Sequence, residues 1–253
     1  MMKLKLYIDK NVDQNAALYF EKAKKAKKKL KGALEALEQT KKKLGKLELE
    51  QPKVEEKPTQ TRKKEWYEKY RWFISSEGFL VLGGRDATTN EILIKKHTEK
   101  DDVVLHTDMA GSPSFVVKAA GKKPGKKTLE EAATATASYS RAWRLGLTTL
   151  DVFYVKPEQV TKKAKSGEYL GKGAFMITGK TNYLRPGVEL AVGNKDGRVI
   201  SGPVSAVKKQ TKEFVVVKQG SEKTSSVAKR IKKKIGCDLD EIIRALPAGG
   251  CSL

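Results

Sequence analysis

The chain has 253 residues, and its 52 Lys and Arg against 30 Asp and Glu give a formal net charge of +22 at pH 7. This excess favours a polyanionic partner, nucleic acid before any other, because phosphate contacts and the release of counterions dominate such binding. Lysine runs also occur on solvated helix faces and against membrane surfaces, so charge alone does not decide the partner.

Composition excludes several other classes of protein. No apolar run approaches the roughly 20 residues of a transmembrane helix, and residues 1–10 lack the apolar stretch of a signal peptide. Two cysteines and two histidines exclude a disulfide framework and disfavour a zinc site. We therefore expect a cytoplasmic protein with no membrane contact and no cofactor.

The N-terminal segment, residues 1–50, is predicted to be a long basic helix from Val12 onward. Small or apolar residues recur every seven positions, which favours a coiled coil or one half of a helical hairpin. Because several of these positions are Ala or Thr, the seam is weak and dimerisation through it alone would be marginal. The surrounding lysines form either a solubilising face or an RNA-contacting face. The two seam series are Ala16, Ala23, Leu30, Leu37 and Leu44, and Tyr19, Ala26, Ala33, Thr40 and Leu47.

Residues 51–64 carry two prolines and no periodicity, so they are predicted to be a linker. Residues 65–193 are predicted to form the folded core, in which one helix at 128–145 interrupts a series of short strands. Thr128 is its expected cap, Glu131 the reciprocal capping partner and Gly146 its end. The predicted strands are 72–74, 79–82, 92–96, 103–107, 115–119, 151–155 and 175–178.

Residues 194–253 are predicted to hold a hairpin of two strands, 199–207 and 213–217, and then helices at 225–235 and 239–246. The whole pattern predicts an α+β fold, a mostly antiparallel sheet with one main packed helix. The long coiled-coil-like helix precedes this core, and a small α/β appendage follows it. The expected domains are therefore 1–50, 51–64, 65–193 and 194–253.

The run Gly83-Gly84-Arg85-Asp86 follows a predicted strand and precedes Asn90. Two adjacent glycines let the backbone adopt positive φ and approach a ligand, while the guanidinium of Arg85 offers a fork for phosphate. The alternative is a hairpin turn with Arg85 paired to Asp86 or to another carboxylate. The spacing matches neither a Walker loop nor a dinucleotide fingerprint. Arg85 and Asn90 are candidate RNA contacts.

His106, Asp108 and Ser112 come at the end of a predicted apolar strand. A His and an Asp two positions apart on a strand face the same side and suit an acid–base pair. No nucleophile motif accompanies them, so we favour a structural hydrogen-bonded pair or contacts with ribose and phosphate over catalysis.

Two further segments carry candidate contacts. Arg141 lies beside Trp143 on the predicted helix, where a tryptophan is more often core than a base-stacking platform. Lys162, Lys163 and Tyr169 belong to a loop rich in cations and glycine. Such a loop suits contact with single-stranded or bulged RNA, and an ordinary exposed loop is the alternative.

Motifs spaced across residues 72–177 together resemble a known domain. They are Trp72-Phe73-Ile74-Ser75-Ser76-Glu77-Gly78, Gly83-Gly84-Arg85-Asp86, Asn90-Glu91, His106-Thr107-Asp108, Ser140-Arg141-Ala142-Trp143, Gln159-Val160, Gly167-Glu168-Tyr169-Leu170 and Gly173-Ala174-Phe175-Met176-Ile177. They resemble the RNA-binding NFACT-R domain of the ribosome quality control family, whose members are called NEMF, Rqc2 and RqcH. Archaeal members, which carry the older name of fibronectin-binding protein A homologues, are the most similar. The resemblance covers about Lys64 to Gly193.

The resemblance implies a non-catalytic protein that binds large ribosomal subunit RNA and tRNA on stalled nascent-chain complexes. The family's NFACT-N domain and helix-hairpin-helix segment have no counterpart in these residues. We therefore expect a fragment or a split-gene product whose companion is an NFACT-N-containing polypeptide. The family's activity of adding a C-terminal tail to the nascent chain is not assigned to this chain. Two alternatives are a nucleic-acid-processing enzyme using His106 and Asp108, with Arg85 as an anion clamp, and an adhesin. The lack of an export signal argues against the adhesin.

Overall fold

The computed structural model describes residues 5–50, 65–162 and 170–253, and within 43–50 it describes the backbone alone. The chain divides into two compact units, Met1–Lys63 and Lys64–Leu253.

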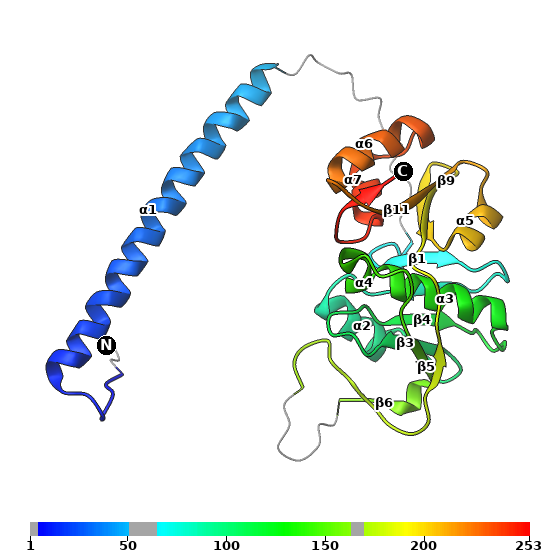
Figure 1. Ribbon diagram of the computed structural model, residues 1–253, viewed down its shortest axis with the longest axis horizontal. Helices are drawn as coiled ribbons and strands as arrows, with labels where there is room; N and C mark the ends of the chain where they lie inside the picture. The colour runs from blue at the N-terminus through cyan, green and yellow to red at the C-terminus, as the bar shows by residue number, and fades with distance from the viewer. Residues whose placement is uncertain (1–4, 51–64, 163–169) are drawn as a thin grey trace. The chain divides into compact units, whose positions relative to one another are not determined.

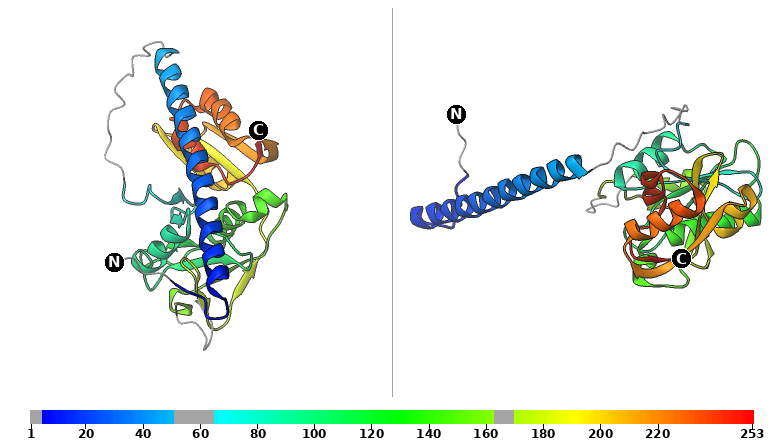
Figure 2. Two further views of the ribbon diagram at one scale, coloured as in Figure 1. Left: turned by 90° about the vertical axis from the view of Figure 1, so that its left-hand side faces the viewer. Right: turned by 90° about the horizontal axis from the view of Figure 1, so that it is seen from above.

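The first unit contains helix α1, Val12–Glu50, which runs unbroken in both views of Figure 2. The helix begins at Val12 because Asn11 and Gln14 cap each other. The Oδ1 of Asn11 accepts from the Gln14 amide at 2.8 Å, and the Oε1 of Gln14 accepts from the Asn11 amide at 3.1 Å. The long helix is confirmed, and its leucines at 30, 34 and 37 are each more than half exposed.

The second unit is built on antiparallel sheets (Figure 1). A six-stranded sheet has the order β1-β2-β4-β3-β5-β8, a four-stranded sheet has the order β10-β9-β11-β12, and β6 pairs with β7. The six-stranded sheet consists of β1 (Arg71–Ile74), β2 (Leu80–Gly83), β4 (Phe115–Lys118), β3 (Val103–Thr107), β5 (Val152–Val155) and β8 (Asn182–Leu184). The other strands are β6 (Val160–Thr161), β7 (Met176–Ile177), β9 (Leu190–Lys195), β10 (Arg198–Gly202), β11 (Phe214–Glu222) and β12 (Cys251–Ser252).

Successive residues of a strand point to opposite sides of a sheet. Both faces of the six-stranded sheet carry apolar side chains, and helices cover both faces. Val81, Leu105 and Val117 face one side, where they pack with the alanines of α3. Leu82 and Val104 face the other side, where they pack with Leu93 of α2. The helices of this unit are α2 (Ala87–Lys96), α3 (Lys126–Ser138), α4 (Arg141–Leu145), α5 (Val204–Gln210), α6 (Thr224–Ile235) and α7 (Leu239–Ala245), and a 3₁₀ turn, η1, covers Pro157–Gln159.

The α+β class with mostly antiparallel sheets is confirmed, but three element predictions are wrong. The predicted strand at 92–96 is the second half of helix α2. The predicted helix at 128–145 is two helices, α3 and α4, separated at Tyr139 and Ser140. The predicted hairpin of 199–207 with 213–217 does not form, because β10 and β11 both pair with β9 and α5 lies between them in sequence.

Thr128 does not cap its helix, since α3 begins two residues earlier, at Lys126, and its N-cap is Gly125. Its hydroxyl and amide both donate to the carboxylate of Glu77. Glu131 is buried, and it accepts from the Ser76 amide and the Ser205 hydroxyl. Both side chains therefore hold distant segments together.

The expected boundary between 193 and 194 lies inside β9. One buried cluster contains Phe115 and Trp143 together with Val192, Val217 and Ile231. Residues 194–253 thus share a core with strands on the other side of that boundary. No helix in the described ranges is long and apolar enough to cross a membrane.

Candidate nucleic-acid interface

A cavity of about 410 Å³ opens at one end of the six-stranded sheet. The strand register explains its position, because Arg71 pairs with Gly83, Gly83 with Phe115 and Phe115 with Leu105. The start of β1, the end of β2, the start of β4 and the end of β3 therefore meet in one row. Of the nine candidate RNA contacts, four line this cavity, namely Arg85, Asn90, His106 and Ser112.

The two glycines at the end of β2, Gly83 and Gly84, serve close packing and not a positive φ, which neither of them adopts. A Cβ on Gly83 would lie 2.3 Å from the ring of Phe115, and one on Gly84 would lie 1.9 Å from the Oδ1 of Asn90. Asn90 is buried, and the same Oδ1 accepts from the Ser114 amide at 3.1 Å. This part of the motif fixes the cavity wall.

Arg85 is anchored by backbone carbonyls and is not a free phosphate fork. Its Nε donates to Lys69 at 3.1 Å, its Nη1 to Arg244 at 2.6 Å and its Nη2 to Tyr70 at 3.0 Å. The alternative pairing with Asp86 is also wrong, because the Asp86 carboxylate caps α2 by accepting from the Thr89 amide at 2.8 Å. Burial lowers the pKa of Arg85, and the nearby Arg244 charge acts in the same direction.

His106 and Asp108 have different partners. The strand β3 ends at Thr107, so the alternation that would place both side chains on one face does not extend to Asp108. The Nε2 of His106 donates to the Ser112 carbonyl at 3.1 Å, and Asp108 accepts from the Tyr183 hydroxyl at 3.3 Å. Burial lowers the pKa of His106, against the opposite effects of backbone hydrogen bonds and of Asp108. Burial therefore favours the neutral form of His106.

Ser112 is buried, and its hydroxyl lies 2.5 Å from that of Thr107 and donates to the Met109 carbonyl at 2.8 Å. This bonding closes the loop between β3 and β4. The side chain of Ser112 thus shapes the cavity, while its carbonyl orients His106.

Three further candidates, Asp108, Arg141 and Lys162, are described by the structure but do not line the cavity. Arg141 is exposed at the first position of α4. The Nζ of Lys162 donates to the Gly171 carbonyl at 3.0 Å and lies 3.3 Å from the Oε2 of Glu91. Glu91, which also binds Lys95 and the Gly173 amide, has its pKa lowered to about 2 by these contacts. Lys163 and Tyr169 lie outside the described residues.

Arg71 and Lys172 also line the cavity, although the sequence did not single them out. Among the lining residues, Arg71, Arg85 and Lys172 are cationic, and Asp86 is the one carboxylate. A signal for Arg71 does exist in the sequence. It lies two residues before Phe73 in a strand, so a cation shares the face of a core aromatic.

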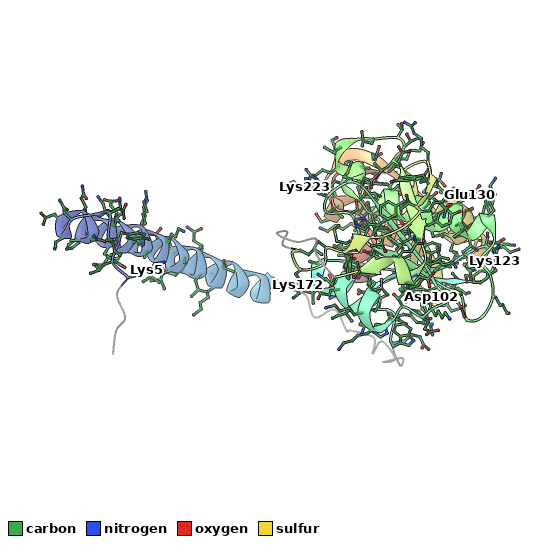
Figure 3. All side chains as sticks on the ribbon, turned by 90° about the horizontal axis from the view of Figure 1, so that it is seen from below. Lys5, Asp102, Lys123, Glu130, Lys172 and Lys223 are labelled. Carbon is green, nitrogen blue, oxygen red and sulfur yellow. The ribbon has the colours of Figure 1, made fainter. Side chains whose placement is uncertain are left out.

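Positive charge is carried by both units, and within the second unit it is not confined to one side. Figure 3 shows Lys123 and Lys172 on opposite sides of this unit. The cavity is therefore distinguished by two partly buried arginines at one place, Arg71 and Arg85, and not by the density of surface lysines.

Comparison with known proteins assigns the domain that holds the cavity. Residues 69–179 match the family described as the NFACT protein RNA binding domain. This range contains every element that lines the cavity, so the class of the folded unit is an RNA-binding domain of the NFACT-R type.

The chain carries the NFACT-R domain of the ribosome quality control family. It is 43% identical over 200 residues to the archaeal Rqc2 homolog aRqcH of Methanocaldococcus jannaschii, a match that covers 76% of this chain and 30% of the relative. It is 39% identical over 176 residues to the ribosome quality control complex subunit NEMF of Homo sapiens, covering 68% of this chain and 16% of NEMF. The chain thus spans less than a third of the length of either relative. Neither relative's name denotes an enzyme.

A solved structure, the C-terminal part of the fibronectin/fibrinogen-binding protein from Streptococcus suis, has a TM-score of 0.41 and 19% identity to this chain. The match covers 71% of this chain and 77% of that one.

Proposed function

We propose that this chain binds RNA in ribosome-associated quality control, contacting large ribosomal subunit RNA and tRNA on stalled nascent-chain complexes. The observation that carries the proposal is the cavity of the NFACT-R domain, where three cations face one carboxylate. A net positive, partly buried site attracts phosphate more strongly than scattered surface lysines do, because solvent screens it less.

The proposed role is binding without turnover, in the cytoplasm where the ribosomes are. The partners of His106 and Asp108 support this, because each side chain is used in a different structural contact. An NFACT-N-containing polypeptide is the proposed protein partner, and co-purification of the native protein with its RNA and protein companions tests this part.

Filter binding with purified large subunits and with tRNA tests the RNA-binding role. We expect binding to both, and we expect the affinity to fall about 10- to 1,000-fold between about 50 and about 200 mM salt as counterions are released. A matched assay with small subunits measures non-specific binding. Equal affinity for large and small subunits, or no binding to any RNA at low salt, would contradict the proposal.

A further inference from the structure

Arg71 is held on an aromatic stack at the edge of the cavity. Its register partner Gly83 pairs in turn with Phe115, so Arg71 and Phe115 project from the same face of the sheet. The guanidinium carbon lies 4.4 Å from the centre of the Tyr139 ring, and that ring stacks on Phe115 at 6.1 Å. A cation over an aromatic face is fixed in position without its N–H groups being used.

Arg71 has no acceptor for the buried part of its guanidinium. Its Nε is inaccessible to solvent and has no hydrogen-bond partner among the residues that the structure describes. The neighbouring Arg85, in contrast, donates to three carbonyls. A buried donor without a partner is costly, which favours a site whose acceptor arrives with a ligand.

The surroundings of Arg71 do not neutralise it. Burial lowers the pKa of Arg71, and the charge of Arg85 lowers it further, while Tyr139 and Asp86 act in the opposite direction. Asp86 is already engaged, since its carboxylate accepts from the amide and the hydroxyl of Thr89. An anion that enters the cavity would therefore meet an excess of positive charge.

Apart from polar residues such as Asn90, His106 and Ser112, much of the remaining cavity wall is apolar and partly aromatic. Phe153, Phe175 and Ile177 line it together with the cations. Its volume of about 410 Å³ lies within the range of about 300–1,000 Å³ of small-ligand sites. An anion anchor beside an aromatic wall matches a nucleotide, which has a phosphate at one end and a flat base at the other.

We propose that this cavity receives one unpaired nucleotide of the bound RNA, with Arg71 holding its phosphate and the wall formed by Phe153 and Phe175 holding its base. The inference rests on the proposed function, because it requires that the chain bind RNA. A free nucleotide offers the same chemistry, and the test separates the two sources.

Fluorescence polarisation of the full chain tests the proposal with three probes: a short single-stranded RNA, a blunt RNA duplex of equal length, and uridine monophosphate. We expect Arg71→Gln to weaken single-strand binding about 10- to 100-fold, the effect of losing one charge-assisted hydrogen bond, and to leave duplex binding within about threefold. Arg144→Gln, which removes an exposed arginine outside the cavity lining, is the matched control and should change both by less than about threefold.

A second variant keeps the test decisive if Arg71→Gln does not fold. Ala110 lines the cavity from an exposed position, so Ala110→Trp fills the opening without removing a charge. We expect it to weaken single-strand binding as well, whereas Ala110→Ser should not.

Each remaining outcome has one meaning. The cavity assignment is overturned if Arg71→Gln and Ala110→Trp leave the affinity for single-stranded RNA unchanged. It is also overturned if the variants lose duplex binding and single-strand binding equally. Both results leave the proposed function standing. Uridine monophosphate that binds in an Arg71-dependent way without competing with RNA would show a free-nucleotide site and also overturn it. Wild-type protein that binds no RNA would overturn the proposed function and this inference together.

Discussion

Arg71 and Arg85 lie at the same end of the sheet, but they differ in what accepts their N–H groups. Arg85 joins three segments, because its acceptors are the carbonyls of Lys69, Tyr70 and Arg244. Arg71 has its charge held by an aromatic ring and its buried donor unused. One arginine therefore contributes mainly to stability, and the other is available to a ligand.

Arg85→Gln should destabilise the folded unit by about 1–2 kcal/mol, because three charge-assisted hydrogen bonds are lost and the partly buried Tyr70 carbonyl loses its donor. Arg141→Gln, at an exposed position, should stay within about 0.5 kcal/mol of wild type. Denaturant unfolding measures both. Equal stability of the two variants would mean that the Arg85 contacts contribute nothing to folding.

Acidification should destabilise the protein through its two histidines. Burial lowers the pKa of both His97 and His106 from the ordinary 6.5. The unfolded chain therefore binds more protons, so stability is complete above pH 6.5 and falls as the pH drops toward the lowered values. Denaturant unfolding at pH 7.5 and at pH 5.5 should show this loss, and the double variant His97→Gln, His106→Gln should lose less over the same interval. An identical pH dependence in the double variant would contradict the assignment.

At the scale of elements, the cap of α2 links the cavity to the stability of the fold. Asp86 accepts from the Thr89 amide, and the Thr89 hydroxyl accepts from the amides of Arg85 and Asp86. This reciprocal cap holds the glycine turn against the start of the helix, so the cavity wall and the helix end are one structure.

Asp86→Ala should cost about 1 kcal/mol, the usual effect of removing an N-cap carboxylate. Asp101→Ala is the matched control, because Asp101 is exposed and lies in a turn. Thermal unfolding of the two variants checks this. A control that loses as much stability as Asp86→Ala would show that removal of any carboxylate, and not loss of the cap, is responsible.

Short apolar runs were the main source of error in predicting elements from the sequence. The run Ile92-Leu93-Ile94 is compatible with strand or helix. What decides for helix is the cap formed by Asp86 and Thr89, which lie six and three residues before this run. The predicted strand at 199–207 contains Pro203, after which the chain turns into α5. The four strands β1, β3, β4 and β5 were predictable, because each is a β-branched or aromatic run with clear breakers at its ends.

At the scale of the whole molecule, the position of the site was more predictable than its chemistry. Candidates near strand ends, such as Arg85 after β2 and His106 in β3, do gather at one cavity, because antiparallel register brings alternate strand ends together. Their roles depend on partners that are distant in sequence, as the bond from Arg85 to Arg244 shows. Arg71 was missed because a single sequence does not reveal that a buried donor lacks an acceptor.

The division into two units leads to a test of which part of the charge matters. The buried hydrophobic clusters draw on residues from Tyr70 onward, whereas the described side chains of α1 are largely exposed. A chain that starts at Lys64 should therefore melt cooperatively within about 2 °C of the full chain, since little buried area is removed. It should keep the Arg71-dependent binding of single-stranded RNA but show a shallower dependence of affinity on salt, because the lysines of α1 no longer contribute phosphate contacts.

Calorimetry and polarisation titrations at several salt concentrations measure the melting temperature and the salt dependence of RNA affinity. A truncated chain that melts far lower, or whose RNA binding no longer responds to Arg71→Gln, would show that the first unit supports the fold or the cavity directly. An unchanged salt slope would show instead that the lysines of α1 are a solubilising face.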